Sequence, residues 1–507
     1  MIKSKTFRPW LPGQTDLMPA SPIEWLPSDH LVFFLLDLTN ELDFSAIMAP
    51  ALAKDPRGEK GFDPRMMTLL LLYAYCIGIV SSRKIERACY EDLAFRVLTG
   101  NQQPDHSRIS EFRRRNLDAL SSLFVQILRL CQKAGMVSLG HVALDGTKVE
   151  ANASKHKAMS HERMLKAEAQ LEKEIEELMR KAEIVDAQED GKYGKKKRGS
   201  DLPKELQRKE DRVEKIRQAR MELEAETAAV AARERLQQAA EAEEAAEKAS
   251  EEERQKLNTK AERARVKAEA ARELAMGKAE LAGVEPPDLE PLGSDQMPRR
   301  GLAHKADGTP TAKTQRNFTD PDSHIMKGNG EMIQGYNCQA VVDGDHQVIV
   351  AVGVSNQSPD VEHLKPMLER TIANTGACPT TFIADAGYWS EDNAEICSKA
   401  QTDPHIATGR QKHGQPPPST KGRIPKNLDA KDRMARKLRN KKGREIYAKR
   451  KTIPEPVFGQ TKEARGLRRF LLRGLEKVNG EWTLWSTTHN ILKLFRFQKA
   501  KKAMATA

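Results

Sequence analysis

The chain has 507 residues, which is too long for one ordinary hydrophobic core, so we expect two or three domains. Charged residues make up 31% of the sequence and aromatic residues 5%, with a formal net charge of +12. This basic excess is typical of proteins that bind nucleic acid or an anionic membrane, and a basic soluble protein without such a partner is the alternative. The six cysteines form no CxxC pair, so the sequence suggests neither a zinc ribbon nor a disulfide framework.

The sequence predicts no membrane span. The longest apolar run, residues 66–80, is short for a bilayer and contains Gly78, so it predicts a buried helix. The first residues lack the apolar segment of a secretory signal. Together with the scattered cysteines, these features predict a cytoplasmic protein with reduced thiols and no membrane partner.

Residues 1–135 have the apolar periodicity and capping residues of a helical domain. Asp63 and Pro64 mark the start of a nearly all-apolar helix, because proline fits the first turn. A helix that ends near Gly100 is followed by a polar turn and then by a short basic helix over residues 105–115. This outline is typical of a helix-turn-helix, and a surface helix of an ordinary bundle is the alternative. The predicted DNA-binding residues of the basic helix are Arg108, Arg113, Arg114 and Arg115.

Two short apolar runs lead into an aspartate that is followed by glycine. The run HVALDGTKV carries Asp145, and the run TFIADAGYW carries Asp385. Each predicts a buried strand that ends at its aspartate, with small residues that allow a ligand or ion to approach closely. We therefore expect two carboxylates delivered from one sheet to one place.

A third acid, Glu455, lies between two prolines in the sequence KTIPEPVFGQTK. Proline is tolerated in the first turn of a helix, so Glu455 is predicted at the start of a helix that continues to Val478, with Lys462 on nearly the same face. The alternative for Glu455 is electrostatic, because glutamate favours the first turn of any helix. The strongly basic tract of residues 430–451 precedes it and is predicted to follow a phosphate backbone or to be a solvated face.

Residues 156–299 interrupt this pattern. Apolar residues recur at spacings of three and four over residues 164–182 and again over 202–223, which predicts heptad-like seams. After Thr227 the sequence is rich in Ala, Glu, Arg and Lys up to Pro286. We predict an inserted antiparallel coiled-coil arm, which serves dimerisation or spans DNA, or else is simply a solvated helical insertion.

Without the insertion, residues 136–155 and 300–507 read as strand, strand, strand, helix, strand, helix, strand, helix. This order resembles the ribonuclease H-like fold, an α/β fold with a mixed sheet whose first and fourth strands are adjacent. Adjacent strands lie about 4.8 Å apart, so Asp145 and Asp385 are expected to share a metal ion. Two like charges so close need a cation to remain ionised.

The combination of motifs resembles bacterial insertion-sequence transposases of the DDE type, with an N-terminal half similar to the InsH-like transposase domain. The matching segments are VALDGTKVEANAS, FTDPDSHIMK, GYNCQAVVD, IADAGYWS and EPVFGQTKEARGLRRFLLRGLEKV. The resemblance implies DNA cleavage and strand transfer that depend on two Mg²⁺ ions held by Asp145, Asp385 and Glu455, with Mn²⁺ as a possible substitute. It also implies a tyrosine–arginine–glutamate–lysine signature at Tyr447, Arg450, Glu455 and Lys462. In this signature Tyr447, Arg450 and Lys462 contact phosphate, although Lys451 occupies the usual place of the arginine and is the alternative to Arg450.

The same resemblance implies double-stranded DNA partners, namely terminal inverted repeats and target DNA. It also implies a homodimer in the synaptic complex and association with the bacterial nucleoid. Two alternatives remain at this point. A metal-dependent nuclease of the same fold would cut DNA without joining ends. A decayed or repurposed transposase would bind DNA without cutting it, although all three acids are present in order.

Overall fold

The structure is a computed structural model that describes residues 22–53, 61–193, 204–290, 293, 295–328, 330–409, 420–422 and 428–506. Contacts divide the chain into two compact units. The first contains residues 1–130 and 487–507, and the second contains residues 131–486.

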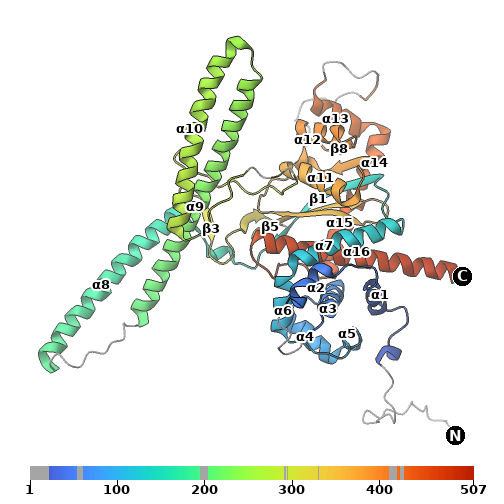
Figure 1. Ribbon diagram of the computed structural model, residues 1–507, viewed down its shortest axis with the longest axis horizontal. Coiled ribbons are helices and arrows are strands. Elements are labelled where there is room, and N and C mark those ends of the chain that lie inside the picture. The colour runs from blue at the N-terminus through green and yellow to red at the C-terminus, as the bar shows by residue number, and fades with distance from the viewer. Residues whose placement is uncertain are drawn as a thin grey trace, which may run out of the picture. The chain divides into compact units, whose positions relative to one another are not determined.

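The first unit is helical (Figure 1). Its core helix, α3 (Pro64–Cys76), is buried over ten consecutive residues because nearly every position is apolar, and Asp63 caps its first turn as predicted. The C-terminal part of the last helix, α16 (Leu475–Thr506), also belongs to this unit, where Phe495 packs on Phe34. Residues 487–507 therefore group with the helical unit, whereas the sequence analysis placed them with residues 300–486. The other helices are α1 (Leu31–Leu38), α2 (Ser45–Leu52), α4 (Ser82–Glu91), α5 (Leu93–Leu98), α6 (His106–Arg115) and α7 (Leu117–Lys133).

The second unit is built on a mixed sheet of six strands. Its strands are β1 (His141–Glu150), β4 (His324–Lys327), β5 (Met332–Asp343), β6 (Ile349–Ser355), β7 (Thr381–Ala384) and β8 (Asp403–Ile406). The order is β4-β5-β1-β7-β8, with β6 also paired to β5. Strand β1 is antiparallel to β5 and parallel to β7, and β7 is parallel to β8. The prediction of a mixed α/β architecture is thus confirmed.

The register of β1 places the two aspartates side by side. The pairs run from His141 with Thr381 to Ala143 with Ile383. Asp145 and Asp385 each lie two residues beyond the last of these pairs, so the same register places them next to each other. The prediction that the strand ends at Asp145 is wrong. Strand β1 continues to Glu150 because it pairs with β5 along its whole length beyond Asp145.

Helices follow the strands of this sheet. They are α11 (Leu364–Thr375), α12 (Glu391–Lys399), α13 (Ala430–Arg439), α14 (Lys441–Thr452) and α15 (Pro454–Gly459). The predicted single helix from Pro454 to Val478 is wrong. Helix α15 ends after six residues and a π-helical turn follows at Gln460–Ala464. The chain then leaves helical structure until α16, with the left-handed glycines Gly466 and Gly474 in between.

Three long helices form the insertion, α8 (His161–Tyr193), α9 (Lys204–Glu247) and α10 (Glu251–Ala282) (Figure 1). Helix α9 packs on both neighbours. Large apolar residues fill the seam with α8, whereas the seam with α10 consists of alanines such as Ala232 and Ala275. The predicted Leu202 lies outside the described residues. A two-stranded sheet of β2 (Ala158–Ser160) and β3 (Gln315–Asn317) lies where the chain enters and leaves the insertion.

Among the described residues, no helix combines the length and apolar composition that crossing a bilayer requires.

Candidate active site

Asp145 lies in the middle of β1, and its side chain is only 16% exposed. Burial raises the pKa of this carboxyl to about 6, and the nearby Asp385 and Glu455 also favour its neutral form. The backbone N–H of Gly146, which donates to Asp145 Oδ1 at 2.9 Å, and the guanidinium of Arg450 oppose this shift. The carboxylate is therefore held in a place where its charge needs a cation.

Asp385 follows β7 and begins a tight turn. Its Oδ1 accepts a hydrogen bond of 2.8 Å from the N–H of Gly387, which fixes the carboxylate at the strand end. Glu455 comes from a different element, the first turn of α15, and its side chain is 51% exposed. The structure thus brings together three acids that are far apart in sequence.

Arg450 lies between two of these acids. Its Nη1 is 3.8 Å from Asp145 Oδ2, and its Nη2 is 3.6 Å from Glu455 Oε1. Tyr447, one turn earlier on α14, is half-buried beside Arg450, and burial raises the pKa of its phenol. Lys451, the alternative candidate for the arginine position, has an exposed side chain. The geometry therefore favours Arg450 as the cation of this site.

Lys462 lies in the π-helical turn that follows α15. It is therefore not on the same face of one continuous helix as Glu455, contrary to the prediction from the sequence. Its Nζ donates to the backbone carbonyl oxygen of Lys148 at 2.8 Å, and burial lowers the pKa of its ammonium. It thereby ties the segment after α15 to β1, three residues beyond Asp145.

The chemistry of this site suits a hard divalent cation. All its donors are carboxylate oxygens, which Mg²⁺ and Mn²⁺ accept, and the buried Asp145 requires a positive partner to ionise. In the described ranges, however, no three acidic, histidine or cysteine side chains are close enough to enclose a metal as they stand. Asp145 and Glu455 instead share the guanidinium of Arg450.

Basic residues lie on the helix that leads to this site. Helix α14 has exposed side chains at Lys441, Lys442, Arg444, Lys449 and Lys451. On α13, Lys437 forms an ion pair with Asp403 of β8 instead. The basic tract therefore presents most of its exposed charge on α14.

The predicted arginines of the first unit differ in their surroundings. Arg108 and Arg115 are exposed. Arg108 pairs with Asp105, the N-cap of α6, and Arg115 pairs with Glu111 of the same helix. Arg114 is exposed. Arg113 is only 4% exposed, and its Nη1 donates to the Val80 carbonyl at 2.9 Å and to the Tyr75 hydroxyl at 3.1 Å. Its guanidinium is thus a structural group within the helical unit.

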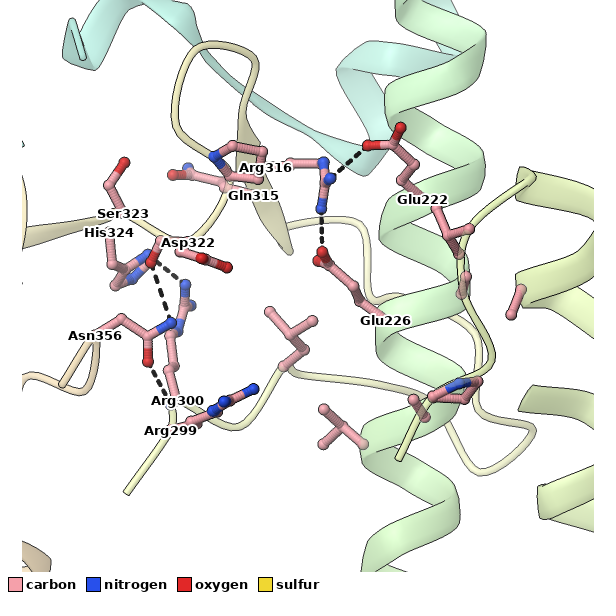
Figure 2. Close-up of a pocket in the computed structure, with 18 of the residues that line it drawn as sticks. Glu222, Glu226, Arg299, Arg300, Gln315, Arg316, Asp322, Ser323, His324 and Asn356 are labelled. Carbon is pink, nitrogen blue, oxygen red and sulfur yellow. Dashed lines mark hydrogen bonds and ion pairs between the residues drawn. The ribbon is translucent and has the colours of Figure 1, made fainter. Parts of the chain in front are cut away.

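A separate cavity of about 280 Å³ lies at the base of the insertion, between α9 and the segments around β3 and β4 (Figure 2). On one wall Arg316 forms ion pairs with Glu222 and Glu226 of α9. On another, the Arg300 guanidinium donates to His324 Nδ1. None of the predicted site residues lines this cavity.

Four polar residues close to the acids were not singled out from the sequence, namely Asn337, Gln339, Asp360 and Tyr388. Asn337 and Gln339 are fully buried on β5. A signal was present in GYNCQAVVD, where two amides alternate with apolar residues in an otherwise apolar strand. Asp360 has no such signal, because it lies in a loop before α11.

Two family models match the chain. The model described as transposase domain (DUF772) matches residues 21–115. The model described as transposase DDE domain matches residues 300–491, which include Asp385 and Glu455. Comparison with curated proteins and with solved structures gave no match.

Proposed function

The chain belongs to the DDE-type insertion-sequence transposases, those with an InsH-like N-terminal half, and on this premise we propose that it cleaves DNA at the terminal repeats of its element and transfers the strand to target DNA. The observation that carries the proposal is that Asp385 and Glu455 both lie close enough to Asp145 to raise its pKa, while Arg450 lies between Asp145 and Glu455.

The sheet topology supports a ribonuclease H-like catalytic domain. Three antiparallel strands, β6, β5 and β1, continue into the parallel strands β7 and β8. That order matches the arrangement expected for this fold, in which the first and fourth strands carry the first two acids. The helical insertion between β1 and β5 would then be an addition to the catalytic domain, and its paired helices support the coiled-coil proposal.

In this proposal Asp145, Asp385 and Glu455 hold two Mg²⁺ ions. The ions would supply Lewis-acid activation of the attacking water or 3′-OH and stabilisation of the leaving oxygen. The chain's own part is to keep the three carboxylates ionised and oriented. The parallel register of β1 and β7 fixes the first two, while Glu455, on the short helix α15, is the more exposed of the set.

Tyr447, Arg450 and Lys462 would orient phosphates near the acids, since contacts to phosphate position DNA without reading its sequence. Arg450 would exchange its carboxylate partners for a phosphate when DNA and metal bind. The exposed lysines of α14, including Lys451, would follow the flanking backbone, as would Arg108, Arg114 and Arg115 of α6. Arg113 is left out of this set because it is buried.

Work on two DNA ends implies a homodimer in the synaptic complex, and the inserted helices are a candidate for its contact surface. We place this activity on bacterial chromosomal DNA in the cytoplasm. Deletion of residues 164–283 tests the role of the insertion, because assembly on end DNA that is unchanged by the deletion excludes it.

The direct test is cleavage of a DNA duplex that carries the terminal repeat of the element. The reaction is run with Mg²⁺, with EDTA and with Asp385→Asn. The matched control is Asp392→Asn, which makes the same chemical change at an exposed position of α12. We expect a free 3′-OH at the repeat boundary with the wild type and the control only.

Two outcomes would favour the alternatives. Cleavage without joining to a target duplex would indicate a nuclease of the same fold. Binding of the repeat with normal salt dependence, but no cleavage with Mg²⁺ or Mn²⁺, would indicate a DNA-binding protein and remove the catalytic role of the three acids.

A further inference from the structure

Strand β5 places two amide side chains in a fully buried layer next to the acids. Asn337 and Gln339 are both 0% exposed, and they lie on one face of the strand, alternating with Tyr336, Cys338 and Ala340. Burying an amide is costly unless its polar atoms are hydrogen-bonded. The sequence therefore keeps these two residues at a cost that apolar side chains would avoid.

Both amides bond to one carboxylate. Asp360 Oδ1 accepts from Asn337 Nδ2 at 2.7 Å and from Gln339 Nε2 at 3.0 Å. It also accepts from Lys148 Nζ at 3.2 Å, so the charge of Asp360 is already neutralised. Gln339 Nε2 donates to Asn337 Oδ1 as well, at 2.9 Å. Asp360 is thus the centre of a connected polar network.

On one side the network contacts the strand that carries Asp145. Gln339 is the cross-strand partner of Gly146, the residue after Asp145, and Asn337 is the partner of Lys148. A Cβ atom at Gly146 would overlap Gln339 Nε2, so a larger residue there would displace the Gln339 amide from its hydrogen bonds. The position of the Gln339 side chain and the path of the chain after Asp145 therefore determine each other.

On the other side the network contacts the turn that carries Asp385. Tyr388, three residues later, is buried, and its hydroxyl donates to Gln339 Oε1. A Cβ atom at Gly387 would lie 3.1 Å from Asp385 Oδ1 and 3.5 Å from Asp360 Oδ2. The same turn is thus held by Gln339 and packed against Asp360.

We propose that Asp360, Asn337, Gln339 and Tyr388 form a positioning network that sets the separation and orientation of Asp145 and Asp385. The inference rests on the proposed function and assigns a role to the GYNCQAVVD segment. Displacement of a reacting group by about 1 Å can lower a rate about a hundredfold, so a network that bonds the segments after both acids has a direct effect on the reaction. Its members act through the two aspartates and do not contact substrate.

The test compares two tyrosines that each lose one buried hydrogen bond. Tyr388→Phe removes the bond to Gln339 Oε1. The matched control is Tyr336→Phe, on the opposite face of β5, which removes a bond of 2.8 Å to Asp320 Oδ1. Gln339→Leu is the second network variant and removes all amide contacts at similar volume.

Three readouts are taken for each variant: the midpoint of urea unfolding, Mn²⁺ affinity by electron paramagnetic resonance, and cleavage of end DNA across a range of Mg²⁺ concentrations. We expect Tyr388→Phe and Gln339→Leu to weaken Mn²⁺ binding about tenfold and to slow cleavage about tenfold to a hundredfold at saturating DNA. We expect Tyr336→Phe to leave metal affinity and the cleavage rate of folded protein unchanged, even where it lowers the unfolding midpoint.

Equal Mn²⁺ affinity in the wild type, Tyr388→Phe and Gln339→Leu would overturn the network proposal, as would equal effects of the two tyrosine variants. Failure of the proposed function has a different signature, namely a wild-type protein that binds Mn²⁺ through Asp385 but does not cleave the repeat. In that case the Mn²⁺ comparison still decides whether the network positions the acids.

Discussion

The guanidinium of Arg450 lies between Asp145 and Glu455, with nitrogen–oxygen distances of 3.8 and 3.6 Å. One residue later, Lys451 is exposed. Two adjacent basic residues of α14 therefore have different environments, and only the arginine is placed to compensate the charge of the acids.

This difference predicts unequal effects of two neighbouring substitutions. Arg450→Ala removes the cation beside Asp145, and we expect cleavage of end DNA to fall about a hundredfold, the order of magnitude found when a positioned charge is lost from an active site. Lys451→Ala is the matched control. We expect it to change mainly DNA affinity and to reduce the slope of log affinity against log salt by about 1. A larger loss of cleavage with Lys451→Ala would assign the phosphate contact to Lys451.

Helix α6 offers a second neighbouring pair, Arg113 and Arg114. Arg113→Met removes two hydrogen bonds from a buried guanidinium, so we expect the free energy of unfolding in urea to fall by about 1–3 kcal/mol. Arg114→Met changes an exposed side chain, and we expect less than about 0.5 kcal/mol. DNA binding should respond in the opposite order, with Arg114→Met the weaker binder once both proteins are folded. If Arg113→Met were as stable as the wild type, the structural role of Arg113 would be excluded.

The sequence predicted the parts of this molecule that depend on local pattern. The strands at Asp145 and Asp385 follow from short apolar runs close to a glycine, and the cap at Asp63 follows from its position before Pro64 and an apolar helix. What could not be predicted depends on tertiary pairing. Strand β1 extends beyond Asp145 because β5 is long enough to pair with it, which no local signal specifies.

The region of Glu455 shows the same limit. Residues 454–478 have continuous helical periodicity, but the chain adopts a π-helical turn, in which Lys462 bonds to the carbonyl oxygen of Lys148. The cation that compensates Asp145 and Glu455 also required the fold, because the sequence alone left Arg450 and Lys451 as alternatives. Burial of Arg113 is a third case, since all four arginines of α6 look alike in a linear pattern.

At the base of the insertion, Arg316 is expected to anchor α9 to β3. It is 7% exposed and pairs with Glu222 and Glu226, whose carboxylates are partly exposed (Figure 2). Loss of one partner of a buried ion pair costs about 3–5 kcal/mol, and we expect Arg316→Met to cost less, about 1–3 kcal/mol, because the glutamates reach water.

Hydrogen exchange of the α9 amides measures this effect locally, and urea unfolding measures it globally. The matched control is Lys166→Met on α8, whose pair with Glu162 is exposed, for which we expect less than about 0.5 kcal/mol. Equal protection of α9 in the wild type and Arg316→Met would show that the ion pairs do not hold the insertion to β3.

The histidine of the same cavity predicts a dependence of stability on pH. Burial, together with the neighbouring Arg300, lowers the pKa of His324 to about 4, and its Nδ1 accepts a hydrogen bond from Arg300. Arginine is only a donor, so His324 is neutral in the folded protein. The unfolded chain binds a proton near pH 6.5 and the folded chain only near pH 4. The contribution of neutral His324 to the free energy of unfolding is therefore complete above pH 6.5, and it is lost as the pH falls to about 4.

Replacement of His324 by glutamine keeps an acceptor for Arg300 and removes the titration. Buried carboxylates also titrate in acid, so the informative quantity is the difference between the two proteins in free energy of unfolding, measured in urea at intervals from pH 7 to pH 4. We expect the wild type to lose stability relative to His324→Gln throughout this interval, because only the wild type takes up the extra proton on unfolding. Parallel curves would mean that His324 has an ordinary pKa and that Arg300 does not keep it neutral.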